Sequence, residues 1–243
     1  MDTWRTWELV LPALERHHQV LAPTLPGHAG GPPLSEPPAA GALADAVERA
    51  MDDAGFDTAH LAGNSLGGYV ALQLAARGRA RTVVALAPAG GWAEGDDSFK
   101  QVLALQAELY ERTRQAVPHA EAILATPEGR RRATEYITKN FEHIPRELLL
   151  HQLLGVASCN GAQVLIEQAL HNGWSLEPEK ITCPVRIVWG THDALLKWPS
   201  AAARYRSEWL PHADWVELDG VGHCPQLDVP LETAELFLGF TAR

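Results

Sequence analysis

A serine stands in a short glycine-rich segment whose pattern can make its hydroxyl reactive. The segment reads Gly63-Asn64-Ser65-Leu66-Gly67, directly after an apolar run and directly before a stretch of helical character. A serine in a strained turn between a strand and a helix holds its hydroxyl above the end of the sheet, and the flanking glycines let the helix pack close. There the N–H of Leu66 can donate to an oxyanion. The pattern predicts a nucleophile at Ser65, although a plain glycine-rich connection would also fit.

The chain also supplies a carboxylate and a histidine at suitable places downstream. A serine hydroxyl is a poor nucleophile until a base takes its proton, and that base is usually a histidine oriented by a carboxylate. Asp193 follows the apolar run Val185–Trp189, and His223 follows the run Asp214–Leu218. The ends of parallel strands share one edge of a sheet, where such sheets bind ligands. We therefore expect Ser65, Asp193 and His223 to converge at that edge.

Nearby polar residues offer alternatives to two of these assignments. Asp219 is the substitute acid if Asp193 is only a turn residue, and His223 could be a structural histidine. Cys224 beside His223 is a bystander thiol in our interpretation, because adjacent residues rarely face each other usefully. His192 is interpreted as a turn residue.

The elements that must position these residues alternate between strands and helices. Such alternation is the signature of βαβ units, and continuous apolar runs suit parallel strands that are covered on both faces. Strands are predicted at Gln19–Leu25, Ala59–Gly63, Arg81–Ala87, Val185–Trp189 and Asp214–Leu218. Helices are predicted at Trp4–Arg16, Pro38–Ala54 with Ser35 or Glu36 as its cap, Leu66–Arg77, Ser200–Leu210 and Leu231–Phe240. The predicted fold class is α/β, with a mostly parallel sheet flanked by helices.

The middle of the chain has a different character. Residues 96–175 contain no convincing strand, and we interpret them as a helical insertion of four stretches. The breaks lie at Pro118, Pro127, Pro145 and 159–161. Residues 1–95 and 176–243 then form one α/β core.

Together these motifs resemble the α/β-hydrolase family along nearly the whole chain. The resemblance rests on Gly63–Gly68, on Trp189–Asp193, on Gly222-His223 with Pro225 and Asp228–Pro230 after it, and on Leu25–His28. It implies that Ser65 is the nucleophile, His223 the general acid/base and Asp193 the orienting acid. It also implies that residues 96–175 are the family's helical cap and that neither a metal nor an organic cofactor is needed.

The expected activity is hydrolysis of an ester, thioester or lactone of a small to medium, apolar substrate through an acyl-enzyme. Within the family the same triad also serves C–C bond hydrolases, cofactor-free haloperoxidases and lyases. A non-catalytic ligand receptor that keeps the triad is a further alternative. An aspartate nucleophile is excluded, because Ser65 occupies that position.

The chain has eight tryptophans, which is many for 243 residues. Those in regular elements are expected in the core: Trp4, Trp7, Trp189 and Trp215. Three others follow a strand, end the helical insertion or follow the acid loop, and we expect them to line a substrate pocket: Trp92, Trp174 and Trp198.

The start of the chain departs from the family pattern. The resemblance implies three strands before Trp4 and a His-Gly pair that supplies the second oxyanion donor, and neither is present. The third of those strands would lie between Gln19–Leu25 and Ala59–Gly63. We therefore expect the N-terminal strands to be absent and Met1 to be an internal methionine. Alternatively, the two strands on either side of the missing one pair directly, or a partner chain in a homodimer supplies the missing strand. A truncated, weakly active enzyme is the corresponding functional alternative.

Composition narrows the partners. The formal net charge of −10 argues against a nucleic-acid-binding surface, which would need a basic patch. No apolar stretch approaches the ~20 residues of a membrane span, and no secretory signal is visible. The three cysteines are irregularly spaced, which indicates reduced thiols. We expect a cytoplasmic protein whose partner is a small-molecule substrate.

Overall fold

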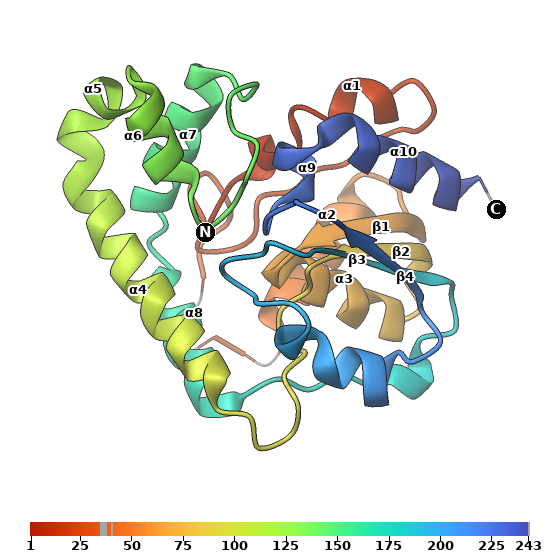
Figure 1. Ribbon diagram of the computed structural model, residues 1–243. Helices are drawn as coiled ribbons and strands as arrows, with labels where there is room; N and C mark the ends of the chain where they lie inside the picture. Colours follow the sequence, from red (N-terminus) through yellow and green to blue (C-terminus); the bar gives the residue numbers. More distant parts are fainter. Residues whose placement is uncertain (35–37, 40, 243) are drawn as a thin grey trace.

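A parallel sheet forms the centre of the molecule (Figure 1). The computed structural model describes residues 1–34, 38–39 and 41–242, so the expected caps Ser35 and Glu36 lie outside the described residues. The sheet has four strands in the order β1-β2-β3-β4, and every neighbouring pair is parallel. All four lie at predicted runs: β1 (Ala59–Asn64), β2 (Ala80–Leu86), β3 (Val185–Gly190) and β4 (Asp214–Leu218).

Alternation along the central strands shows why both faces of the sheet are covered. Val83 and Ala85 of β2 point to one face, where they join the core formed with α3 (Leu66–Ala76). Val84 and Leu86 point to the other face and pack against α10 (Pro230–Thr241). This two-sided burial explains why the strands are continuous apolar runs.

The predicted helices in the core form with different regularity. Helices α3 and α10 match their predicted positions closely. Helix α2 (Ala42–Asp53) begins later than predicted. The expected helix Trp4–Arg16 is instead a 3₁₀ turn, Trp4–Trp7, and a short α1 (Leu11–Leu14), because proline at position 12 has no N–H to continue a helix. The expected helix Ser200–Leu210 contains a 3₁₀ turn, Ser200–Ala202, and a π-helical turn, Tyr205–Trp209. One further 3₁₀ turn covers Pro178–Lys180, and a short α9 (Pro225–Asp228) precedes α10.

Residues 98–172 form a layer of helices on one side of the sheet (Figure 1). We call this layer the helical segment. It holds five α-helices where four stretches were predicted, since Ala120–Leu124 is a short helix of its own. Their bounds are α4 (Ser98–Ala116), a 3₁₀ turn (Val117–His119), α5 (Ala120–Leu124), α6 (Pro127–Thr134), α7 (Arg146–Ala157) and α8 (Ala162–Asn172). Its apolar side chains pack with Cys224 and Leu227 of the α9 region.

The predicted strand at Gln19–Leu25 is wrong. This segment pairs with no strand of the sheet, and β1 forms an edge of the sheet. A strand needs a ladder partner, and the space between residues 19–25 and β1 belongs to a cavity that both of them line. Among the described residues, no strand precedes β1.

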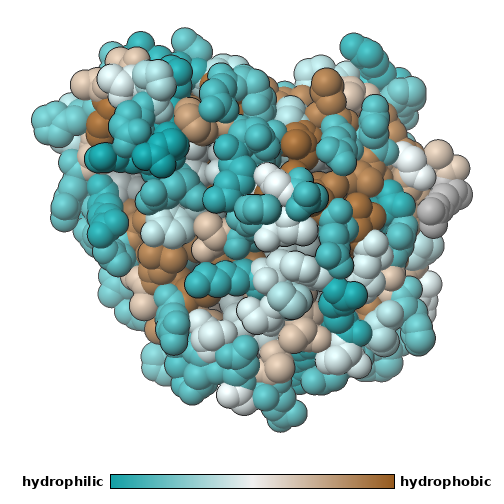
Figure 2. Space-filling model, viewed as in Figure 1, coloured by the Kyte–Doolittle hydropathy of each residue, from teal (hydrophilic) through white to brown (hydrophobic). Residues whose placement is uncertain are grey.

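The face shown in Figure 2 is mostly hydrophilic, with smaller apolar patches between the hydrophilic side chains. Leu231, at the start of α10, is the most exposed of the large apolar residues, at 76%. Within the described ranges, no single helix is long and apolar enough to cross a membrane. The bent pair α7 and α8, with 65° between them, reaches that length and composition only when taken together.

Candidate active site

Ser65 occupies a strained turn between β1 and α3. Its φ of +54° and ψ of −118° lie outside the regions that residues with a side chain normally adopt. Such a conformation costs about 1–3 kcal/mol and persists only where neighbours enforce it. Here the Ser65 N–H donates to the carbonyl of Leu86 at 2.9 Å, and the Ser65 carbonyl accepts from Tyr69 and Ala89 at 3.1 and 3.0 Å. These bonds fix both sides of the turn.

Two glycines, Gly63 and Gly68, allow this turn, whereas the motif pointed to Gly63 and Gly67. A Cβ on Gly63 would lie 2.1 Å from the carbonyl oxygen of Gly67, so no side chain fits there. A Cβ on Gly68 would lie 3.1 Å from both Gly63 O and Pro88 Cβ. A Cβ on Gly67, in contrast, would meet nothing within 4 Å. The close approach of helix and strand thus depends on Gly63 and Gly68, and Gly67 is not needed for packing.

His223 and Asp193 form a buried pair. His223 Nδ1 lies 2.7 Å from Asp193 Oδ2, and the two residues are only 2% and 5% exposed. The other carboxylate oxygen of Asp193 accepts from the N–H groups of Leu195 and Leu196 at 2.9 and 2.7 Å. Both Asp193 oxygens are therefore used, and the carboxylate is held in one orientation toward the imidazole.

The alternatives near this pair are engaged elsewhere. Asp219 accepts a hydrogen bond from Thr191, and the exposed His192 also contacts Thr191. Burial raises the pKa of the Cys224 thiol well above its ordinary value, and nearby carboxylates add to the effect. A thiolate is the reactive form of cysteine, so this environment keeps Cys224 unreactive. Within the described residues, no three His, Cys, Asp or Glu side chains are grouped to hold a metal ion.

Asn64 joins the serine turn to the histidine loop, a role that the sequence did not suggest. Its Nδ2 donates to the carbonyl oxygens of Leu86 and His223 at 3.1 and 2.9 Å. Its Oδ1 accepts from Gln226 Nε2 and Cys224 Sγ, both at 3.2 Å. The residue directly before Ser65 therefore fixes the backbone of His223.

Ser65, Leu66 and His223 line the same cavity, which has a volume of about 1610 Å³. Leu66 is the first residue of α3, in the turn whose N–H groups lack intrahelical acceptors. The cavity reaches helices of the helical segment on one side and the free edge of β1 on the other. Ser65, Leu66 and His223 therefore surround one space large enough for a substrate, and Asp193 lies behind His223.

Comparison with known proteins agrees with this architecture. Residues 1–236 match the alpha/beta hydrolase family. The chain belongs to the alpha/beta hydrolase family. This confirms the resemblance that the motifs indicated and the fold class that followed from it.

Named relatives of this hydrolase act on different bonds. It is 34% identical over 204 residues to the epoxide hydrolase EphH of Mycobacterium tuberculosis, covering 82% of this chain and 92% of the relative. It is 28% identical over 247 residues to a pimeloyl-[acyl-carrier protein] methyl ester esterase of Aromatoleum aromaticum, covering 96% and 91%. A 2-hydroxy-6-oxo-6-phenylhexa-2,4-dienoate hydrolase from Rhodococcus sp. strain RHA1 has the same fold, with a TM-score of 0.75 at 18% identity over 100% of this chain and 86% of that one. The relatives support a hydrolase, and the solved structure supports the fold.

Two of the three predicted pocket tryptophans of the hydrolase line the cavity. Trp92 and Trp174 do so, and the Trp174 ring meets the edge of Tyr69 at a centroid distance of 4.9 Å. Trp198 does not line this cavity, since its ring packs between Trp189 and Trp215 at centroid distances of 5.9 and 6.2 Å. Among the tryptophans expected in the core, Trp189 is fully buried, whereas Trp4 is 43% exposed.

His28 also lines the cavity of the hydrolase, although the sequence gave it no defined role. It is 8% exposed, and its Nδ1 lies 3.1 Å from the carbonyl oxygen of Pro26. Burial, together with the nearby N-terminal ammonium, lowers the pKa of His28 to about 4. The imidazole is therefore neutral at physiological pH.

Proposed function

We propose that this hydrolase cleaves an ester, thioester or lactone of a small to medium, apolar substrate, with Ser65 as the nucleophile. The observation that carries the proposal is the buried His223–Asp193 pair, whose histidine lines the same cavity as the strained Ser65 turn. A base held by a carboxylate beside a serine is the arrangement that activates a hydroxyl.

The tautomer of His223 follows from its partner. The Asp193 carboxylate can only accept a hydrogen bond, so the proton of the neutral imidazole lies on Nδ1, and Nε2 keeps a lone pair that can take the Ser65 proton. As Ser65 Oγ bonds to the substrate carbonyl carbon, His223 takes its proton and passes it to the leaving alcohol or thiol. Water then attacks the acyl-enzyme, His223 accepts its proton, and the acid is released with Ser65 restored.

Charge on the carbonyl oxygen needs a donor during both steps. Leu66 opens α3 and lines the cavity, so its N–H is suited to this task. The helix N-terminus adds a favourable field for the oxyanion. Leu66 supplies one half of the oxyanion hole in this account.

The cavity walls support an apolar substrate. Trp92 and Trp174 line the cavity, and their rings lie 6.4 Å apart. Apolar residues of the helical segment, including Val102, Leu103 and Leu149, also line it. Residues 96–175 would thus serve as a cap that excludes water and limits substrate size.

Ester cleavage is favoured over epoxide opening, despite the name of one relative. Attack of Ser65 on an epoxide carbon would join enzyme and substrate by an ether, which the histidine-activated water could not hydrolyse. A carboxylate nucleophile would instead give an ester that water can cleave. Because the turn holds a serine, acyl transfer is the chemistry that returns the free enzyme.

A series of p-nitrophenyl esters with acyl chains of two to twelve carbons tests this proposal, with styrene oxide as the competing substrate. We expect ester turnover by the native chain and a loss of at least about 10³-fold in Ser65→Ala. The matched control is Ser175→Ala, a cavity serine of the same size. Turnover of the epoxide alone, or ester turnover that survives Ser65→Ala, would overturn the proposal.

A further inference from the structure

The loop that carries His223 is attached to the helical segment through one buried carboxylate. Asp228 ends α9 and is only 2% exposed. Its Oδ2 accepts from the N–H of Gly222 at 2.6 Å, and Gly222 is the residue directly before His223. The same oxygen accepts from the N–H of Lys139 at 2.9 Å. One atom thus bridges the histidine loop and the connector between α6 and α7.

The second oxygen of Asp228 completes the attachment. Oδ1 accepts from the backbone N–H and from Nδ2 of Asn140, both at 2.7 Å. This carboxylate accepts four hydrogen bonds and is fully satisfied, and removing it would leave the N–H of the buried Gly222 and the two N–H groups of the connector without these acceptors. The connector therefore depends on Asp228 as much as the histidine loop does.

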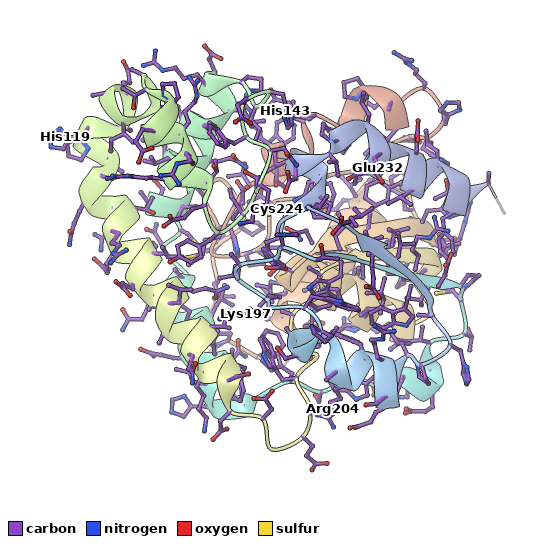
Figure 3. All side chains as sticks on the ribbon, viewed as in Figure 1. His119, His143, Lys197, Arg204, Cys224 and Glu232 are labelled. Atoms are coloured by element: carbon purple, nitrogen blue, oxygen red, sulfur yellow. The ribbon has the colours of Figure 1, made fainter. Side chains whose placement is uncertain are left out.

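Further contacts follow the same boundary. The Cys224 N–H donates to the carbonyl of Ile137 at 2.8 Å, and His143 Nε2 lies 2.8 Å from the carbonyl oxygen of Leu227. Figure 3 shows Cys224 and His143 at this boundary. A Cβ on Gly222 would lie 3.0 Å from Thr138 Cα, so the two segments meet closely. Asp228 accepts four of the hydrogen bonds that hold the two segments together.

We propose that Asp228 is a positioning residue, which holds the His223 loop against residues 137–140 of the helical segment and so places the imidazole for catalysis. Asp228 is not among the described residues that line the cavity, so it acts through the backbone of Gly222 and not on the substrate. This inference rests on the proposed function, in which His223 is the general base. A displacement of about 1 Å in such a group can lower a rate by about 10²-fold.

Three substitutions separate positioning by hydrogen bonds from the charge of Asp228. We expect Asp228→Ala to lower kcat on the best p-nitrophenyl ester by about 10- to 100-fold, with KM within about 3-fold. Asp228→Asn keeps one oxygen for Gly222 and Lys139 but turns an NH₂ group toward the two donors of Asn140, so we expect kcat to fall by only about 3- to 10-fold. Glu235→Gln is the matched control on an exposed carboxylate of α10 and should leave both constants unchanged.

A second readout does not depend on turnover. In the native chain the Gly222 amide should exchange slowly with solvent, because Asp228 accepts its proton. Asp228→Ala should speed this exchange at least about 10-fold, and Asp228→Asn should do so less. If Asp228→Ala does not fold, the Asn variant decides through the same two measurements.

The outcomes distinguish this inference from the proposed function. A native chain without ester turnover refutes the proposed function, and Gly222 exchange then decides whether Asp228 holds the loop. Folded Asp228→Ala with native kcat, or a folded Asn variant with native kcat and native Gly222 exchange, overturns the positioning role. Equal losses in the Ala and Asn variants would also overturn it, because they would assign the effect to charge.

Discussion

The serine turn and the histidine loop are held in place in different ways. The glycines that permit the turn at Ser65, Gly63 and Gly68, lie within its own motif. The backbones of Leu86 and Ala89 then fix the conformation through hydrogen bonds. The loop at His223 depends on side chains from other segments. Asn64, 159 positions away, donates to the His223 carbonyl, and Asp193, 30 positions away, pairs with the imidazole. Asp228 accepts from the N–H of Gly222 and also holds the helical segment. Glycines within a motif can be recognised in the sequence, whereas support from side chains of other segments becomes visible only in the folded chain.

The glycines test the local half of this comparison, and we expect the largest effect there. Gly63→Ala would bring a Cβ to 2.1 Å from a backbone oxygen, so we expect destabilisation by about 4 kcal/mol or more and loss of activity. Gly67→Ala meets open space and should keep the native melting temperature or raise it slightly, because alanine favours helices over glycine by about 1 kcal/mol. Thermal unfolding of the pair is the measurement, and equal destabilisation by both would contradict this view of the turn.

Asp193→Asn tests the distant support of His223. The amide can still accept from Leu195 and Leu196, but its NH₂ group would face Nδ1 and favour the tautomer with the proton on Nε2. We expect kcat/KM on an ester to fall by about 10³- to 10⁴-fold with a small change in melting temperature. Asp219→Asn is the control and should remain within about 2-fold. A larger loss in Asp219→Asn than in Asp193→Asn would exchange their roles.

His28 provides a pH test of the cavity wall beside these two regions. Its pKa in the folded chain is about 4, below the ordinary value of 6.5, so the unfolded chain binds more protons between those values. Stability should therefore be complete above about pH 6.5 and should fall by about 3 kcal/mol as the pH decreases to about 4. Urea unfolding at several pH values measures this contribution.

The variant His28→Gln should reduce that slope, while His17→Gln, at an exposed position, should leave it unchanged. The same slope in both variants would show that His28 is not buried as a neutral group. The comparison separates the buried histidine of the cavity wall from an exposed one.

The smallest expected effect concerns Trp174 and Trp198, both of which were predicted to line the substrate pocket. Trp174→Phe changes the cavity wall and should shift the preferred acyl chain length, with kcat/KM for the best ester changing by about 3- to 10-fold. Trp198 lies in a ring stack with Trp189 and Trp215, so Trp198→Phe should lower the melting temperature and leave the preferred acyl chain length unchanged. A shift in preference from Trp198→Phe alone would contradict the assignment.

The features that the sequence predicted well are those with a local signal. The central strands β2 and β3 are apolar runs because both of their faces are buried. The Ser65 turn has its glycines within the motif. His223 and Asp193 were found because each follows a strand of the same parallel sheet. Their actual contact, at 2.7 Å, agrees with that topological argument.

The features that escaped prediction depend on partners that sequence does not reveal. The segment Gln19–Leu25 is as apolar as a strand, but no neighbouring strand accepts its hydrogen bonds. Asn64 donates to the carbonyl of His223, which is 159 positions away. Asp228 accepts from the nearby Gly222, but also from Lys139 and Asn140, which are 89 and 88 positions away. Trp198 was assigned to the pocket by its place after the acid loop, whereas its ring packs on Trp215 from another strand.

Covalent labelling tests the central claim most directly. The intact chain is incubated with a fluorophosphonate, which reacts with a serine that a base has activated. We predict a mass increase of one phosphonyl group, located by peptide mapping on Ser65, absent in Ser65→Ala and strongly slowed in Asp193→Asn. A folded chain that gains no mass, or gains it on another residue, would contradict the account.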